Sequence, residues 1–556
     1  MKSLRDIIIN SAEKYGDNVA LKIKRKNSNT YDEYTFDDIL YYSRKLSNYL
    51  IRKGYKKGDK IGIMGRNSPE WSIAFFAIQL QGFITIPIDR LLEQNEIKHI
   101  LNDSELKALF LDEKYATLIE EIEEDLEFLN EMFILDYNSK NNIYDLMDKT
   151  NEEFPLGEIK RNEEAVYLYT SGTTGKTKGV ILTHNNIISN ITDIEKRLKI
   201  YPEDNFLSFL PVNHAYELTA GFLTNIYSGS TLVFSPSLTS RDIIKTMKEA
   251  SITKMIGVPL IFEKIYNSIN RKIKKMSKLK RFFIKLLFFI GKIKRKFDKS
   301  LNGTKFIFKP ILKKIGFENV KFFVSGGAAL PPYISKFFYL MGVPILQGYG
   351  LTETAPVLSC VSPKDIDFCS VGSPLENIKI RIYNPDDSGI GEIVARGPNI
   401  MKGYYKEKKK TKEVLKRGWF YTGDFGYLKD EKLYIKGRLK NVIVSKGGKN
   451  IYPEEIEEKL LESDFIEEVL VIGDGEPEAI IYPNYEEFDV LAQQNEQQEI
   501  TDEYIYDVLK DEINEMNKLM AGYKRIRNIK LRKEEFPKTS TRKIKRYLFM
   551  EDKRKV

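Results

Sequence analysis

The sequence lacks any apolar run long enough to cross a bilayer, since about 18 consecutive apolar residues occur nowhere in the chain. Residues 1–18 form a charged amphipathic helix pattern without the long apolar core of a secretory signal. We therefore expect no transmembrane helix and no secretory leader. The protein is expected to be soluble or bound at a surface.

Cysteine and histidine are also scarce. The two cysteines, Cys360 and Cys369, have no neighbouring Cys or His at a metal-ligand spacing, which indicates reduced structural thiols in a cytosolic protein. The three histidines, His99, His184 and His214, are too few for a histidine-rich metal site.

The overall composition is that of an ordinary globular protein. With 42% hydrophobic and 30% charged residues, the composition indicates neither a disordered nor a membrane-spanning chain. Its 556 residues exceed what one compact core accommodates, so two or more domains are expected. The net charge of +9 is mild for this length and becomes informative only where it is concentrated.

The most informative stretch is YTSGTTGKTKGV, residues 169–180, which continues the strand-like run EAVYLY. Three glycines let the backbone approach an anion, the hydroxyls of Ser171, Thr173 and Thr174 can donate to it, and two lysines add positive charge. The spacing is not that of a P-loop NTPase, because two residues rather than four separate Gly172 from Gly175. A solvated loop is the alternative, but the combination favours phosphate binding.

Two further strand-to-turn stretches follow, VKFFVSGGAALPP at 320–332 and VPILQGYGLTETAP at 343–356. Such βα units suit nucleotide binding at the carboxyl edge of a parallel sheet. In the second stretch, Glu353 can hold Mg²⁺ against phosphate oxygens and Thr352 can offer its hydroxyl to phosphate. Asp424 lies in a predicted tight turn, from which a carboxylate can accept both hydroxyls of a ribose.

The remaining patterns indicate the fold class. Apolar runs at 59–67 and 82–89 predict buried strands on either side of a helix at 69–81, which is the βαβ pattern of a parallel sheet. The acidic run at 120–131 predicts a solvated helix. Residues 371–407 predict β-hairpins with tight turns. The predicted fold class is therefore α/β.

In this order, the motifs resemble those of the AMP-forming adenylating enzymes: acyl-CoA synthetases, luciferases and peptide-synthetase adenylation domains. The chain looks most similar to the long-chain fatty acid–CoA ligases. Residues 533–549 resemble the family's PKTxxGKxxR motif, with Arg542 in place of its glycine, and Val444 stands where some fatty-acyl members have a lysine. The resemblance implies a large N-terminal domain of parallel-rich βα sheets with a β-subdomain, residues 1–437, and a small mobile α/β C-terminal domain, residues 438–556.

The resemblance also implies roles for the matching residues. Lys543 falls on the catalytic lysine, and Glu353 and Thr173 match catalytic residues that also hold Mg²⁺. The residues implied to bind ATP are Thr170, Ser171, Gly172, Thr173, Thr174, Gly175, Lys176, Lys178, Gly327, Ala328, Gln347, Gly348, Tyr349, Gly350, Thr352, Asp424 and Arg438.

Further matches concern the acid and the thiol. His214 matches the histidine of the family's PxxH motif, which implies an acyl-site and gating residue rather than a general base, and Gly326 is implied at the same site. A buried structural histidine is the alternative. Lys440 matches the hinge about which the small domain swings, and Gly447 and Gly448 resemble the loop lining the coenzyme A channel.

The most unusual composition lies at residues 265–314. Between Arg271 and Lys299 there are many basic residues and one acid, Asp298, around the apolar core FFIKLLFFIG. That core is too short to span a bilayer, but a basic apolar helix fits the interface, where each Lys or Arg contributes about 1 kcal/mol near an anionic leaflet. A solvated insert or a partner-binding helix is the alternative. No recognition motif accompanies the charge, so no nucleic acid is expected.

We expect an enzyme that converts a long-chain fatty acid through acyl-AMP to acyl-CoA, using ATP, Mg²⁺ and coenzyme A, with AMP and pyrophosphate released. Its expected location is cytoplasmic and peripheral at the inner face of the membrane. One alternative is an acyl–acyl carrier protein synthetase, which shares the first step. Another is a non-catalytic, membrane-bound lipid-binding protein or scaffold with this fold. The set Thr173, Glu353, Asp424, Arg438 and Lys543 favours the enzyme.

Overall fold

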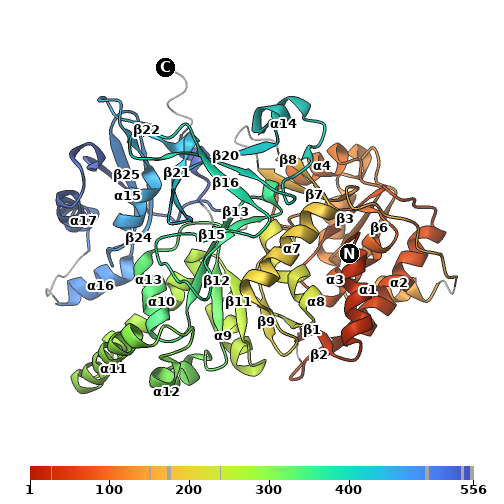
Figure 1. Ribbon diagram of the computed structural model, residues 1–556, viewed down its shortest axis with the longest axis horizontal. Helices are drawn as coiled ribbons and strands as arrows, with labels where there is room; N and C mark the ends of the chain where they lie inside the picture. The colour runs from red at the N-terminus through yellow and green to blue at the C-terminus, as the bar shows by residue number, and fades with distance from the viewer. Residues whose placement is uncertain are drawn as a thin grey trace. The chain divides into compact units, whose positions relative to one another are not determined.

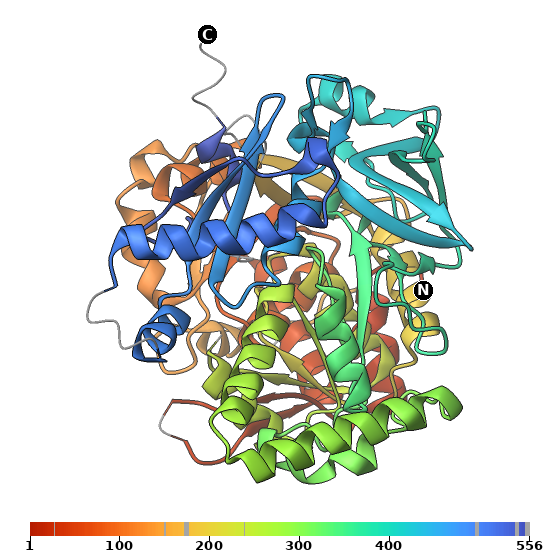
Figure 2. The ribbon, with the colours of Figure 1, turned by 90° about the vertical axis from the view of Figure 1, so that its left-hand side faces the viewer.

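The computed structural model describes the chain except residues 27, 150–151, 172–176, 238, 495–499, 540–543 and 551–556, and gives only the backbone at 171, 240 and 494. The chain forms two compact units (Figures 1 and 2). The first consists of residues 1–380 and 395–420, and the second of residues 381–394 and 421–556.

A nine-stranded sheet is the larger of the two sheets in the first unit. Its order is β15 (Ser373–Pro374), β14 (Val357–Cys360), β13 (Ile345–Gly350), β12 (Phe322–Ser325), β11 (Lys254–Gly257), β9 (Asn205–Ser208), β10 (Thr231–Phe234), β1 (Val19–Ile23) and β2 (Asp32–Thr35). The strands from β13 to β1 are parallel, and the strands at each end are antiparallel.

The second sheet has seven strands. Its order is β18 (Gly403–Tyr404), β8 (Thr177–Thr183), β7 (Glu164–Ser171), β4 (Ile84–Pro87), β3 (Lys60–Met64), β5 (Ala108–Leu111) and β6 (Glu131–Ile134). The predicted strands around residues 59–67 and 82–89 are confirmed as β3 and β4, which pair in parallel. The strand before the phosphate-loop stretch is also confirmed, and β8 returns antiparallel to it, so that this loop closes a hairpin.

Helices cover and separate the two sheets. They are α1 (Arg5–Tyr15), α2 (Phe36–Arg52), α3 (Pro69–Leu80), α4 (Gln94–Asp103), α5 (Ala116–Glu120), α6 (Ile143–Met147), α7 (His184–Leu198), α8 (Thr224–Ser228), α9 (Ser240–Glu249), α10 (Pro259–Lys274), α11 (Lys278–Phe297), α12 (Lys305–Ile315), α13 (Pro332–Leu340) and α14 (Lys408–Val414). Among the described residues, none of these helices is long and apolar enough to cross a membrane.

Helices α3 and α7 lie between the sheets (Figure 1). The predicted helix at 69–81 is α3, which starts at the Ser68 cap with proline at its first position. Every residue of α3 is buried, because it contacts β3 and β4 on one side and β1 on the other. A helix that is apolar all round suits such a central layer. Helix α7 likewise contacts β7, β8 and β14.

The expected helix at 120–131 is wrong. Helix α5 ends at Glu120, a 3-10 turn spans Glu123–Asp125, and β6 begins at Glu131. Five acids within residues 120–125 repel one another at helical spacing, and no basic residue separates them.

The second unit is built on two sheets. The first has the order β16 (Lys379–Tyr383), β17 (Gly391–Arg396), β20 (Trp419–Lys429) and β19 (Leu415–Lys416), with β21 (Lys432–Arg438) also on β20. Strand β19 and the outer ends of β16, β17 and β20 are counted with the first unit. The second has the order β24 (Ile466–Gly473), β25 (Pro477–Pro483) and β26 (Asn528–Leu531). With them are a short ribbon, β22 (Ile443–Val444) and β23 (Asn450–Ile451), and the helices α15 (Pro453–Leu460), α16 (Tyr485–Gln494) and α17 (Asp502–Lys518).

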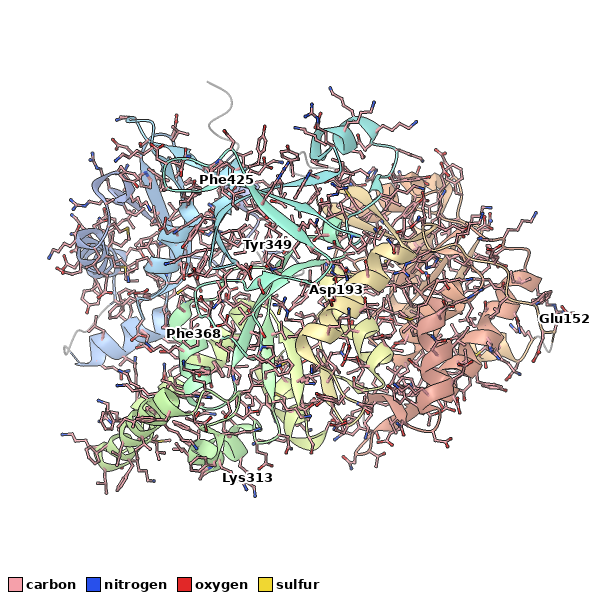
Figure 3. All side chains as sticks on the ribbon, viewed as in Figure 1. Glu152, Asp193, Lys313, Tyr349, Phe368 and Phe425 are labelled. Atoms are coloured by element: carbon pink, nitrogen blue, oxygen red, sulfur yellow. The ribbon has the colours of Figure 1, made fainter. Side chains whose placement is uncertain are left out.

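Contacts across residue 437 explain why the hairpin sheet groups with the C-terminal residues. Helix α15 contacts β21, and Lys436 on that strand pairs with Glu455 on the helix at 3.3 Å. Phe425 on β20, labelled in Figure 3, packs its ring against Tyr452, with 6.2 Å between the ring centres. A mobile domain beginning at residue 438 remains a prediction, since it concerns a motion.

Candidate active site

The predicted glycine turns lie at the carboxyl edge of the nine-stranded sheet, because β9, β11, β12 and β13 run parallel. Gly326, Gly327 and Ala328 follow β12 directly. The Gly326 amide donates to the carbonyl of Gly257 at 3.1 Å. A Cβ at Gly326 would lie 2.9 Å from the Tyr216 ring, so the absence of a side chain at Gly326 leaves room for that ring beside the turn.

Strand β13 carries the second predicted nucleotide stretch. Gly348, Tyr349, which is labelled in Figure 3, and Gly350 pair with β14. The side chain of Gln347 is buried and already engaged: its amide nitrogen donates to the carbonyl of Phe368 at 2.9 Å and its oxygen accepts from Leu330 at 3.3 Å. The predicted nucleotide contact of Gln347 would therefore compete with structural hydrogen bonds.

A 3-10 turn after β13, η4 (Thr352–Thr354), presents Glu353. The Pro356 carbonyl would lie 1.8 Å from a Cβ at Gly350, so only glycine allows this close return of the chain. Two hydrogen bonds to its backbone carbonyls hold the turn. The Met401 amide donates to the Glu353 carbonyl at 2.9 Å, and the Asn399 side chain donates to the Thr354 carbonyl at 2.6 Å. Glu353 thus stands on a fixed backbone.

Glu353, Lys178 and Tyr404 form a compact cluster. The Tyr404 hydroxyl donates to Glu353 Oε1 at 2.8 Å. Lys178 Nζ lies 3.9 Å from the same oxygen and 3.6 Å from the centre of the Tyr404 ring. Burial, together with the neighbouring Glu353 charge, raises the pKa of Tyr404 far above its usual value, so the phenol stays a hydrogen-bond donor.

The sequence predicted Glu353 and Lys178 as site residues but missed Tyr404. It lies on β18, which pairs with β8, the strand that carries Lys178. No local pattern in the run GYYKE marks this tyrosine, because its partner is 51 residues earlier in the chain. Only the sheet order brings the three side chains together.

The phosphate-loop stretch lies partly outside the described residues. Those not described are Gly172, Thr173, Thr174, Gly175 and Lys176, and the backbone alone is described at Ser171. Both flanks are well defined: Thr170 pairs with Lys178, and the Tyr169 hydroxyl donates to Asp103 at 2.7 Å. The strand ends that flank these residues therefore lie beside the Glu353 cluster.

His214 follows β9, in a loop tied to the second sheet. Asn67 accepts from the Val212 amide at 3.1 Å and donates to the Leu210 carbonyl at 2.7 Å. His214 Nε2 lies 3.7 Å from a carboxylate oxygen of Asp89, which follows the end of β4 by two residues. By contrast, His184 is buried and accepts the Leu4 amide through Nδ1 at 3.1 Å, which is a structural role.

A π-helix, η3 (Tyr216–Leu223), follows His214 and buries an acid that the sequence prediction missed. Glu217 is fully buried, and its Oε1 accepts the Ser208 hydroxyl at 2.5 Å. Burial raises the pKa of Glu217 to about 8, so the side chain is neutral at pH 7. Gly221 leaves it room, since a Cβ there would lie 2.6 Å from the carboxyl group.

Within the second unit, the predicted tight turn at Asp424 is wrong: Asp424 lies inside β20 and pairs with Arg438 across the β20–β21 hairpin. The Arg438 Nε atom lies 3.0 Å from Asp424 Oδ1, and the aspartate side chain is 6% exposed while the arginine is 58% exposed. An arginine held this way presents the rest of its guanidinium to solvent. The two predicted ribose residues are therefore adjacent.

The other predicted residues of the second unit lie in turns. Lys440 is in the 3-10 turn Leu439–Asn441, directly after β21. Gly447 and Gly448 connect β22 and β23, and Gly448 has a φ of +74°, which favours glycine. Lys446, two residues after Val444, pairs with Glu476 at 3.0 Å. Lys543 and Arg542 lie outside the described residues.

The described residues include no group of three or more His, Cys, Asp or Glu side chains able to enclose a metal ion. Mg²⁺ with phosphate substrates needs no such cage, because it keeps waters and binds one or two carboxylates together with substrate oxygens. The single carboxylate of Glu353, oriented by Tyr404, fits that kind of site.

Comparison with known proteins identifies related sequences over most of the chain. The family model described as AMP-binding enzyme matches residues 9–405, and that described as AMP-binding enzyme C-terminal domain matches residues 440–554. A peroxisomal long chain acyl-CoA synthetase 7 of Arabidopsis thaliana is 29% identical, over 85% of this chain and 72% of its own length. A long-chain-fatty-acid–CoA ligase of Bacillus subtilis is 28% identical, with coverages of 85% and 83%.

Another relative is named for an acyl carrier protein instead of coenzyme A. The chloroplastic long-chain-fatty-acid–[acyl-carrier-protein] ligase of Arabidopsis thaliana is 29% identical, over 87% of this chain and 77% of its own. Solved structures match the fold at lower identity. An anthranilate CoA ligase with anthranoyl-AMP aligns with a TM-score of 0.79 at 21% identity, covering 98% of this chain and 96% of its own. ATP-bound MatB of Rhodopseudomonas palustris gives 0.78 at 21%, covering 99% of each chain.

Proposed function

Since this chain belongs to the AMP-binding enzyme family, the adenylating acid–thiol ligases, we propose that its own reaction is the activation of a long-chain fatty acid by ATP and its transfer to coenzyme A. The observation that carries the proposal is the cluster in which Tyr404 and Lys178 fix the Glu353 carboxylate beside the phosphate-loop hairpin. Such a cluster suits a triphosphate, because it joins a positive charge to a carboxylate that can hold Mg²⁺.

In the first step, a carboxylate oxygen of the fatty acid attacks the α-phosphorus of ATP. The bond from that phosphorus to the bridging oxygen breaks, so pyrophosphate leaves and acyl-AMP remains. Negative charge gathers on the phosphates and on the incoming carboxylate, so the enzyme's task is positioning and charge stabilisation. Lys178 and Lys543 supply positive charge, and Asp424 with Arg438 would position the ribose.

Mg²⁺, when bound, neutralises charge on the phosphate oxygens, and Glu353 and Thr173 are the residues that would hold it. In the second step, the sulfur of coenzyme A attacks the acyl carbon. The bond from that carbon to the phosphate oxygen of AMP breaks, so a thioester forms and AMP leaves. No side-chain nucleophile is needed in either step.

The acyl class is supported by the names of the relatives and by the surroundings of His214. The Arabidopsis thaliana relative is named a long chain acyl-CoA synthetase and the Bacillus subtilis relative a long-chain-fatty-acid–CoA ligase. The π-helix after His214 is buried from Glu217 to Leu223 and contributes Leu218, Ala220 and Phe222 to the core. Apolar surroundings next to His214 favour an alkyl chain over a polar acid.

A specific observation favours a second candidate, the transfer of the acyl group to an acyl carrier protein. One relative of similar identity and coverage carries that activity in its name. Both candidates share the first step and differ in the thiol. A non-catalytic lipid-binding protein is disfavoured, because such a protein would need neither the Glu353 cluster nor the Asp424–Arg438 pair.

The test is to incubate the protein with ATP, Mg²⁺, palmitate and coenzyme A, and to measure AMP, pyrophosphate and free thiol together. AMP rising in step with thiol loss supports the ligase, and repeating the assay across chain lengths tests the acyl class. Pyrophosphate without thiol loss indicates another acceptor, and acyl carrier protein is then added. No product from any fatty acid contradicts the proposal.

A further inference from the structure

Helix α11 has two apolar faces, and only one of them is covered by the first unit. The inner face packs on α12 and α13: the Phe288 ring lies 4.9 Å from that of Phe308 and 5.2 Å from that of Phe337. Gly291 is buried at this contact, where a Cβ would lie 3.2 Å from the Phe308 ring and 3.5 Å from the Leu340 carbonyl. The glycine thus lets the helix approach closely.

Arg295 fixes the C-terminal end of α11. Its side chain is 7% exposed, and its guanidinium donates to the carbonyls of Tyr339, Ser300 and Leu301, with the Tyr339 bond at 2.7 Å. The same guanidinium lies 3.8 Å from the centre of the Tyr339 ring. One basic residue is therefore used to hold the helix rigidly on the body of the unit.

The outer face of α11 leaves large apolar side chains in solvent. Phe297 is 86% exposed, Leu279 67% and Phe282 62%. The full stripe on this helix is Leu279, Phe282, Phe283, Leu286, Phe289, Ile290, Ile293 and Phe297. Steps of three and four residues place all eight on one face. Patches of this kind on soluble proteins mark interaction sites.

Positive charge surrounds the stripe. Residues 271–299 hold thirteen Lys and Arg and a single acid, so the rest of the chain has a slight excess of acid despite the net +9. Lys285, Lys292 and Lys296 are exposed, and their spacing of seven and four places them along one side of the stripe. Lys294 lies on the other side, 4.1 Å above the ring of Phe306, an exposed residue of α12. Helix α12 also carries basic residues, of which Lys313 is labelled in Figure 3.

We propose that the outer face of α11 docks the first unit onto an anionic lipid leaflet. Twenty residues of helix are about 30 Å long, which allows the helix to lie in the plane of the interface with its stripe among the acyl chains. The lysines beside the stripe reach up to the phosphates. The proposal stands apart from the reaction proposed above, since it uses none of the active-site residues.

Charge complementarity selects lipid over other occupants. A second copy of the chain would bring the same thirteen basic residues against the first set, which is unfavourable. A nucleic acid would use the lysines but leave eight apolar side chains in water. An anionic leaflet satisfies both at once, because it offers negative headgroups above an apolar layer.

The experiment is co-sedimentation of the full chain with two kinds of vesicle, phosphatidylcholine alone and phosphatidylcholine with 30% phosphatidylglycerol. We expect binding to the anionic vesicles that weakens as salt is raised. The triple variant Lys285→Gln, Lys292→Gln, Lys296→Gln should bind more weakly by roughly fivefold per lysine, or about a hundredfold in all.

The apolar contribution needs its own variant. Phe282→Ser, Phe289→Ser and Phe297→Ser together should also abolish most binding, since they remove buried rings while keeping every lysine. A matched charge control is Lys408→Gln, Lys409→Gln, Lys412→Gln on α14, which should bind like the unaltered chain. All variants should keep the unaltered melting temperature, since the replaced side chains are exposed.

A reporter keeps the test decisive even if a triple variant misfolds. Phe289→Trp should show a blue-shifted emission with the anionic vesicles, whereas Tyr41→Trp on α2, exposed at 55%, should not shift. Absence of binding to anionic vesicles at low salt overturns the proposal. So does binding that both triple variants retain, or a concentration-dependent dimer that covers Phe289 without lipid at the same low salt.

Discussion

At the scale of single residues, the site depends on how one carboxylate is held. Glu353 accepts the Tyr404 hydroxyl at 2.8 Å, and Lys178 stands 3.9 Å from the same oxygen. Without the phenol, the carboxylate is free to swing toward the lysine and form a closer ion pair. Its orientation toward Mg²⁺ and the phosphates would then be lost.

Tyr404→Phe should therefore lower the rate of acyl-AMP formation about tenfold and raise the Mg²⁺ concentration required for half-maximal rate. The ring stays beneath Lys178, so the change isolates the hydroxyl. Pyrophosphate exchange at graded Mg²⁺ measures both effects. Tyr405→Phe, which loses a hydroxyl bonded to Lys60 at 3.1 Å, is the matched control and should keep the Mg²⁺ requirement. An unchanged requirement in Tyr404→Phe would remove its positioning role.

Lys543 is the second residue with a distinct expectation. Lys543→Ala should reduce acyl-AMP formation by on the order of 10²-fold or more, because a charge at the reacting phosphate is lost, while thioester formation from supplied acyl-AMP continues. Single-turnover assays of the two half-reactions separate them. Lys545→Ala, two residues away, serves as control. Equal losses in both half-reactions would contradict the assignment.

At the scale of elements, the π-helix η3 carries a buried acid, Glu217, that should lower the free energy of unfolding at neutral pH. The pKa of Glu217 is raised to about 8 in the folded protein by burial, against an ordinary value of 4.5. The unfolded chain releases this proton first, so the contribution of Glu217 to stability is complete below pH 4.5 and is lost as pH rises toward 8.

Glu217→Gln keeps the shape of the side chain and removes the ionisation. It should raise the free energy of unfolding of the first unit by roughly 2–3 kcal/mol at pH 7 and by little at pH 4.5. Denaturant unfolding at the two pH values measures the difference. Ser208→Ala removes the hydrogen bond without removing the acid, and it should destabilise at both. A Gln variant that destabilises at pH 7 would show that the acid is ionised there.

The turn after β21 is the element expected to bend. Lys440→Pro fixes φ at residue 440 and restricts residue 439, so it should stiffen the turn. Pyrophosphate release should continue while thioester formation stops, because only the second step needs the second unit to move. Lys440→Ala should support both steps. Unaltered overall turnover in the proline variant would exclude the hinge.

The elements also show which parts of the fold and of the site could be predicted from the sequence. Continuous apolar runs sufficed for β3, α3 and β4, because the lengths of the runs separate two short buried strands from a longer buried helix. The acidic run at 120–131 misled, since charge alone does not show where a helix stops. Tyr404 was out of reach because its contact with Glu353 depends on the pairing of β18 with β8, a long-range event that leaves no local signal.

At the scale of the whole molecule, the residues assigned to the proposed reaction are divided between the two units. The first unit holds Glu353, Lys178 and His214, while the second holds Asp424 and Arg438. The family models divide the chain similarly, at residues 405 and 440. The sequence analysis placed Asp424 in the domain of residues 1–437, and it did not predict that residues 381–394 and 421–437 group with the C-terminal part.

The exposed stripe of α11 also has a consequence for handling the protein. At low ionic strength, the thirteen basic residues between 271 and 299 keep copies apart, because their repulsion reaches over about 30 Å at 0.01 M salt. In 1 M salt it reaches only about 3 Å, and the eight apolar side chains then meet freely. Solubility should therefore fall as salt rises, with light scattering increasing at constant protein concentration, and a mild detergent that covers the apolar side chains should restore clarity.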